Sequence, residues 1–100
     1  MERYRVILAT KVRIQLLNHA SFLASVSLPA AKRFRTAFWQ TLGRLRDNPY
    51  QFPLDPLFNK LNMKYRNALF EGRYKILFTI EGSEVFVDSV IDCRQQLTPS

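Results

Sequence analysis

The sequence is poor in the residues that build metal sites and disulfide frameworks. Its 100 residues include one cysteine, Cys93, and one histidine, His19. A lone cysteine cannot form an intramolecular disulfide, and neither residue has partners at the spacing that a zinc site requires. We therefore expect no metal and no cofactor. His19 is expected to lie on a helix surface, and Cys93 to be a small, half-buried apolar residue rather than a nucleophile.

Long apolar runs are also absent. The longest contain four residues, as at positions 6–9, whereas a helix that crosses a bilayer needs about 18. The N-terminal residues pass directly into an alternating apolar pattern, without the apolar core of a secretory signal. These features predict a cytoplasmic protein with no membrane partner, and the length fits a single domain over residues 1–100.

Acidic residues are scarce in the first half of the chain. Residues 1–50 contain nine basic and two acidic residues, whereas residues 51–100 contain six of each, so the net charge of +7 belongs to the first half. A clustered positive field favours an anionic partner, either nucleic acid or an acidic protein segment. Charge alone does not distinguish these two partners.

Hydrophobic periodicity predicts an α+β fold that begins with a strand and a helical hairpin. Residues 4–9 suit a short strand, and apolar residues spaced by three and four predict a helix over 11–27. Ser27 and Pro29 supply a capping hydroxyl and a first-turn proline, so a second helix is expected to start there. Its inner stripe comprises Ala31, Phe34, Phe38, Leu42 and Leu45.

The second helix is expected to end at Asp47-Asn48-Pro49, since the residue before a proline avoids the helical region. Residues 48–62 combine three prolines with several large apolar side chains. This composition predicts an irregular segment packed on the domain, with one helical turn around residues 57–61.

Three alternating runs follow and predict a three-stranded antiparallel meander, with the hairpin packed on one of its faces. The runs are separated by Glu71-Gly72 and Gly82-Ser83, which suit two-residue turns. A two-residue first turn would place Leu69 opposite Tyr74, and side chains would then alternate between two faces.

The same register extends across the whole predicted sheet. It places Leu77 opposite Asp88 and Arg73 opposite Asp92. The apolar face for the hairpin comprises Tyr65, Leu69, Tyr74, Ile76, Phe78, Ile80, Val85, Val87 and Ile91. The opposite face comprises Lys64, Arg66, Arg73, Lys75, Thr79, Asp88 and Asp92, with Leu77, Phe86 and Val90 among them. This cationic face is the candidate functional surface. Alternatively, it is only the solvated face of the sheet, on which Arg73 pairs with Asp92 across strands.

The order of these elements resembles the RelE/ParE superfamily of bacterial toxins over nearly the whole chain. The matching pieces are His19-Ala20-Ser21-Phe22-Leu23-Ala24, Ala31-Lys32-Arg33-Phe34, Asn48-Pro49-Tyr50-Gln51-Phe52-Pro53, Tyr65-Arg66, residues 72–78 and Val90-Ile91-Asp92-Cys93-Arg94-Gln95. The resemblance implies a type II toxin–antitoxin module, in which a small basic toxin arrests growth until an acidic antitoxin wraps it.

Two activities occur in this superfamily. RelE-like members cut messenger RNA in the ribosomal A site, whereas ParE-like members poison DNA gyrase and have no nuclease activity. The RelE-like pattern makes Arg66, Lys75 and Arg94 candidate catalytic residues, beside the cations Lys64 and Arg73 of the same face. The tail after Arg94 lacks the Tyr or His that these nucleases commonly carry. We therefore favour a ParE-like or otherwise non-nucleolytic action, with ribosome-dependent RNA cleavage as the alternative.

Trp39 lies off the inner stripe of the second helix, beside Lys32 and Arg35. These three residues are candidate contacts for the antitoxin or the target, although Trp39 could instead pack on the proline-bearing segment. A general basic nucleic-acid-binding module is a further alternative. The sequence has no helix-turn-helix glycine pattern, no aromatic RNA-binding strand motif and no zinc spacing that would support it.

Overall fold

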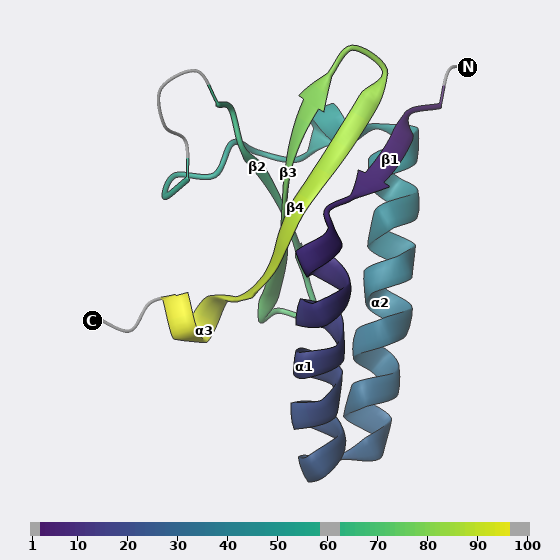
Figure 1. Cartoon of the computed structure of the whole chain (residues 1–100), viewed down its shortest axis with the longest axis vertical. Coiled ribbons are helices and arrows are strands. Elements are labelled where there is room, and N and C mark those ends of the chain that lie inside the picture. Colours follow the sequence, from purple (N-terminus) through teal and green to yellow (C-terminus); the bar gives the residue numbers. More distant parts are fainter. Residues whose placement is uncertain (1–2, 59–62, 97–100) are drawn as a thin grey trace.

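A computed structural model describes residues 3–58 and 63–96 of the chain. In chain order its elements are β1 (Arg5–Leu8), α1 (Thr10–Val26), α2 (Leu28–Asp47), a 3-10 helix (Pro49–Gln51), β2 (Arg66–Phe70), β3 (Tyr74–Glu81), β4 (Glu84–Asp92) and α3 (Cys93–Gln96). The two long helices form an antiparallel hairpin beside a twisted sheet, and the connected end of the hairpin projects beyond that sheet (Figure 1). The predicted order of strand, helical hairpin and meander is confirmed.

Local sequence signals fix the boundaries of α2. The hydroxyl of Ser27 accepts the backbone N–H of Ala30 at 3.3 Å, and a proline occupies the first turn. An N–H at that position has no partner within the helix, so proline costs nothing there. At the other end, the N–H of Asn48 donates to the carbonyl of Arg44 at 2.9 Å before Pro49.

The sheet has the order β1-β4-β3-β2, so the two central strands are consecutive in the chain and the edges are β1 and β2. β1 pairs with β4 in parallel, whereas the other two pairs are antiparallel. A parallel pair requires a long crossover connection, and the helical hairpin contributes to the connection here. The strands that precede and follow the hairpin, β1 and β2, are thus the two edges of the sheet on which it packs.

The turn between β2 and β3 differs from the prediction. It contains three residues rather than two, because Phe70 pairs with Tyr74. Within it, Glu71 (φ 53°) and Gly72 (φ 63°) both adopt the left-handed conformation. Because of the extra residue, each side chain of β2 lies on the face opposite to the one predicted. Phe70 is therefore buried in the core and Leu69 is 60% exposed, so the predicted apolar face is wrong for this strand.

A β-bulge in β4 is the second difference from the predicted register. The turn between β3 and β4 has the expected two residues, and Phe78 pairs with Val87 as predicted. The register then slips, and Leu77 pairs with Ser89 instead of Asp88. Beyond the bulge the predicted faces of β4 are exchanged. Val90 joins the core in place of Ile91, and Tyr74 rather than Arg73 pairs with Asp92.

The hydrophobic core lies between the hairpin and the sheet. Phe34 and Phe38 of α2 and Ile76, Phe78 and Val87 of the central strands are all at most 1% exposed. These residues belong to one contiguous cluster, which also includes Leu42. The predicted packing of α2 on the central strands is therefore confirmed.

Residues 49–58 connect α2 to the edge of the sheet, and we call them the covering segment. Phe52 joins the core on the helix side, whereas Asp55 and Phe58 lie over Lys75 on the face that the helices leave open. The N–H of Asn67 donates to the carbonyl of Pro53 at 3.0 Å, and the N–H of Asp55 donates to the carbonyl of Tyr65 at 2.8 Å. The segment therefore runs along the edge of β2. Its packing confirms the prediction for the described residues, whereas most of the helical turn expected at 57–61 lies outside them.

Candidate functional site

Arg66 is the first residue of β2, and its side chain contacts the start of the covering segment. Its Nη1 donates to the carbonyl oxygen of Phe52 at 2.6 Å, and its guanidinium lies 5.2 Å from the ring centre of Tyr50. Arg66 pairs with Phe78, whose side chain is in the core. Directly opposite residues share a sheet face, so Arg66 lies on the helix side of the sheet, at its edge.

Lys75 lies on the other face and is buried beneath the covering segment. Its Nζ donates to a carboxylate oxygen of Asp55 at 2.6 Å, and the two side chains are 6% and 0% exposed. Phe58 adds a ring 5.4 Å from the ammonium nitrogen. The prediction that Lys75 belongs to an exposed cationic face is therefore wrong, because the covering segment closes over it.

The Asp55 carboxylate is fully enclosed by hydrogen-bond donors. Besides Lys75, it accepts the backbone N–H groups of Leu57 and Phe58 and the amide of Asn67, at 2.8 to 3.0 Å. Burial by itself raises the pKa of this carboxyl, but the hydrogen bonds from Lys75, the backbone and Asn67 outweigh it and hold the pKa below its ordinary value.

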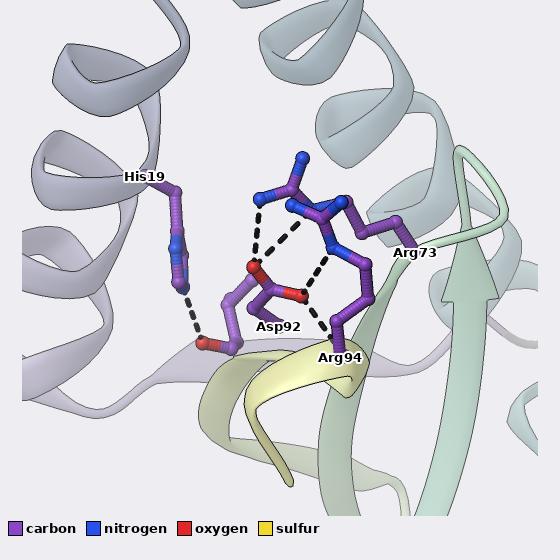
Figure 2. Close-up of polar contacts among 5 residues, drawn as sticks. His19, Arg73, Asp92 and Arg94 are labelled. Carbon is purple, nitrogen blue, oxygen red and sulfur yellow. Dashed lines mark hydrogen bonds and ion pairs between the residues drawn. The ribbon is translucent and has the colours of Figure 1, made fainter. Parts of the chain in front are cut away.

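A second ion cluster lies where β4 ends, and we call it the arginine cluster: Arg73, Asp92 and Arg94. Arg73 donates through Nε and Nη2 to one oxygen of Asp92, at 3.1 and 2.9 Å. The other oxygen accepts the backbone N–H of Arg94 at 3.0 Å and lies 3.9 Å from its Nε. Figure 2 shows both guanidiniums turned toward the one carboxylate. The predicted pairing of Arg73 with Asp92 is thus made by side chains.

Electrostatics within the arginine cluster favour the charged forms. Desolvation acts to raise the pKa of Asp92, but the hydrogen bonds and charges of Arg73 and Arg94 lower it below the ordinary value. The hydrogen bond to Asp92 raises the pKa of Arg73. Burial raises the pKa of the neighbouring Tyr74 hydroxyl. The cluster is therefore a fixed ion network with an excess of one positive charge.

The structure does not bring the candidate catalytic residues together. Arg66 lies at the start of β2 on the helix side, Lys75 is buried on the opposite face, and Arg94 lies beyond the end of β4. Lys64 is exposed and precedes β2. The shared exposed face was a consequence of the predicted register, which the three-residue turn and the bulge overturn.

His19 is a residue that sequence reasoning placed incorrectly. It is partly buried, and its Nε2 donates to the carbonyl of Val90 at 2.9 Å, while the N–H of Val90 donates to Gln15 at 2.8 Å. β1 accompanies β4 only as far as Val87. Two side chains of α1 therefore form the hydrogen bonds to the backbone of Val90 that β1, which ends its pairing at Val87, does not provide. Cys93 has intermediate exposure as expected, and burial raises the pKa of its thiol.

A hollow of about 460 Å³ lies between α1 and α2, and we call it the hairpin groove. Its lining residues are Leu8, Arg13, Leu16, Leu17, Ala20, Arg35, Phe38 and Trp39. Among them, Trp39 is 57% exposed and its ring lies edge-on to that of Phe38, with 5.4 Å between the ring centres. Lys32 lines a neighbouring hollow together with Arg33 and Glu71. The candidate contacts Trp39 and Arg35 therefore share a surface, and Lys32 lies on the next one.

The described part of the chain contains neither a candidate metal site nor a candidate membrane-spanning helix. Residues 3–58 and 63–96 contain no group of three or more His, Cys, Asp or Glu side chains placed to hold a metal ion. Within the same ranges, no helix has the length and apolar character to span a membrane.

The arrangement of a helical hairpin on a four-stranded sheet, with β1 parallel to β4, is a ParE-like fold. A solved structure described as the chromosomal ParDE toxin–antitoxin system from P. aeruginosa matches with a TM-score of 0.72 and 13% sequence identity. The match covers 89% of this chain and 95% of that one. No protein-family model matches the sequence, and curated proteins give no significant match. The predicted RelE/ParE-like fold is thereby confirmed.

Proposed function

We propose that this chain is the toxin of a type II toxin–antitoxin module and that it acts in the ParE manner, on DNA gyrase, without cutting RNA. The structural neighbour is described as a ParDE toxin–antitoxin system, which supports a toxin of such a system. The net charge of +7 suits neutralisation by an acidic antitoxin.

The separation of Arg66, Lys75 and Arg94 carries the proposal of a non-nucleolytic action. Cleavage through a ribose 2′-hydroxyl needs a group that accepts its proton and cations grouped around the charged transition state. Here Lys75 is enclosed with Asp55, and Arg66 holds a backbone carbonyl at the opposite face. A gyrase inhibitor needs only a binding surface, and the chain has suitable surfaces outside the enclosed pair.

We assign the antitoxin to the hairpin groove. Its apolar walls include Leu17 and Trp39, which are both more than half exposed, and its two charged lining residues are Arg13 and Arg35. An amphipathic helix whose apolar stripe is flanked by carboxylates matches such a groove in shape and charge. Trp39 and Arg35 would contact this helix directly, and Lys32 would add to the field that attracts it.

Expression of the chain alone in bacteria tests the proposed function. We expect growth arrest that the cognate antitoxin relieves. With the purified protein, we expect inhibition of gyrase supercoiling and no cleavage of A-site codons on programmed ribosomes, both assayed in parallel on the same preparation. Clean A-site cleavage with gyrase unaffected would reverse this assignment and make the chain a RelE-like nuclease.

A further inference from the structure

A second surface lies on the side of α1 that faces away from the hairpin groove. An α-helix has about 3.6 residues per turn, so Asn18 and Phe22 project opposite to Leu17 and Ala20, which line the groove. Phe22 is 56% exposed, and the guanidinium of Arg73 lies 5.8 Å from its ring centre. The arginine cluster therefore continues onto α1 through an exposed aromatic ring.

The guanidinium of Arg73 is held rigidly in this surface. It lies 5.1 Å from the ring centre of Tyr74 and 5.8 Å from that of Phe22, and it donates twice to Asp92. Asp92 is 4% exposed, and it also accepts the backbone N–H of Arg94. One buried carboxylate thus hydrogen-bonds the guanidinium of Arg73, whose side chain is 22% exposed, and lies within ion-pair distance of that of Arg94, which is 65% exposed. Less conformational entropy is lost when a partner binds side chains that are already ordered.

A hollow of about 410 Å³ adjoins the cluster on the same side of α1. Its lining residues are Gln15, Asn18, His19, Phe58, Val90, Ile91 and Asp92. Three of these lining residues are joined by the hydrogen bonds of Gln15 and His19 to Val90, which hold α1 against β4. We call this hollow together with Phe22 and the arginine cluster the arginine surface.

The charge pattern of α1 indicates what the arginine surface fits. The sequence contains no Asp, Glu, Lys or Arg from Ile14 to Ala31, so α1 adds no cation to this side beyond its first turn. A nucleic-acid backbone is bound by rows of cations along successive phosphates. An exposed phenyl ring, a hollow lined by both polar and apolar residues, and two guanidiniums beside one carboxylate instead match a protein surface with a carboxylate beside an apolar side chain.

We propose that the arginine surface is where this toxin binds its protein target, separately from the antitoxin in the hairpin groove. This inference rests on the proposed function, because it names the contact surface for the target of that toxin. The partner is a protein that presents a carboxylate to Arg73 and Arg94 and an apolar side chain to Phe22. Arginine and aromatic side chains are enriched among the residues that dominate binding energy at such interfaces.

Separation of the two binding activities tests this inference. The test variant combines Phe22→Ser with Arg94→Gln, and both replaced side chains are more than half exposed, so the fold should persist. The matched control combines Leu28→Ser, an exposed apolar residue of the hairpin, with Arg46→Gln, so that net charge changes equally. Melting temperature, growth arrest, gyrase inhibition and antitoxin affinity are measured for each.

We expect the test variant to need at least roughly 30-fold more protein for gyrase inhibition, the effect of losing one dominant interface side chain, and to lose growth arrest. Its antitoxin affinity should stay within about twofold of the original, and the control should match the original in every assay. Unchanged growth arrest would overturn the inference. An equal loss of antitoxin affinity would also overturn it, because the surface would then belong to the antitoxin interface.

Two further results separate this inference from the proposed function. A chain with the original sequence that folds but never arrests growth would refute the proposed function itself. If the original chain cuts A-site codons and the test variant loses that cleavage, the arginine surface binds RNA, and the assignment of a protein partner is wrong.

Discussion

Two buried carboxylates organise the charged residues of this chain, and they do so for different purposes. Asp55 is enclosed with Lys75 and fixes the covering segment to the sheet. Asp92 is also buried, but it pairs with Arg73 and Arg94 where solvent still reaches them. Removing one partner of a buried ion pair leaves a charge without compensation, which costs much more than the net contribution of the intact pair.

Lys75→Met should therefore destabilise the fold by about 3–5 kcal/mol, because the Asp55 carboxylate stays buried without its cation. The double variant with Asp55→Asn should regain much of this loss. An amide oxygen can still accept the N–H groups of Leu57 and Phe58 without carrying a charge. Urea denaturation of the two variants measures the difference. Equal losses would mean that the pair contributes through packing and not through charge.

The stability of the chain should also depend on pH through Asp55. The pKa of its carboxyl is lower in the folded chain than in the unfolded chain, where it is about 3.9. The ionised form therefore stabilises the fold above that value, and the contribution is lost as the pH falls through the folded pKa. We expect the unfolding free energy to fall below about pH 4, with a smaller fall for Asp55→Asn. Parallel curves for both proteins would contradict this assignment.

At the scale of secondary structure, the register of β2 decides which side chains stabilise the sheet. Phe70→Ala should cost about 3–5 kcal/mol, because its ring packs among Phe34, Phe38 and Tyr74 in the core. Leu69→Ala, one position away, removes an exposed side chain and should change stability by less than about 0.5 kcal/mol. Chemical denaturation compares them. A larger loss of stability for Leu69→Ala than for Phe70→Ala would support the register with a two-residue turn.

The elements that were predictable carry their signals in adjacent residues. Ser27 and Pro29 mark the start of α2, and the apolar spacing of that helix identifies the residues that it buries. Turn length is harder to predict from the sequence, because Glu71-Gly72 suits a two-residue turn and also the left-handed positions of a three-residue turn. The bulge near Ser89 leaves no local mark in an alternating strand, so both register shifts escaped prediction.

The site was less predictable than the fold, because its contacts join distant parts of the chain. Asp55 and Lys75 are 20 residues apart, and His19 and Val90 are 71 apart. Their pairing depends on how the covering segment crosses the sheet and on how far β1 follows β4. For Trp39, helical spacing placed the side chain off the buried stripe of α2 but left open whether it packs on the proline-bearing segment, and the structure shows it 57% exposed.

Over the whole molecule, the hairpin side is basic and the meander side is close to neutral. No acidic residue occurs between Arg3 and Arg46, a stretch that includes β1, α1 and nearly all of α2. Long-range attraction acts on the rate at which an oppositely charged partner arrives, whereas buried apolar contacts act on the rate at which it leaves. The hairpin groove combines both features, so its charged and apolar residues should be separable by kinetics.

Neutralising the groove with Arg13→Gln and Arg35→Gln should slow antitoxin association by about tenfold at low ionic strength, because the attraction at the docking surface is reduced. Trp39→Ala should instead accelerate dissociation, since it removes the largest apolar side chain of the groove. Surface-bound antitoxin gives both rates for each variant. Arg46→Gln, outside the lining of the groove, is the control for net charge and should have a much smaller effect. If adding salt slows association equally for the original chain and for the groove variant, the antitoxin is attracted to another surface.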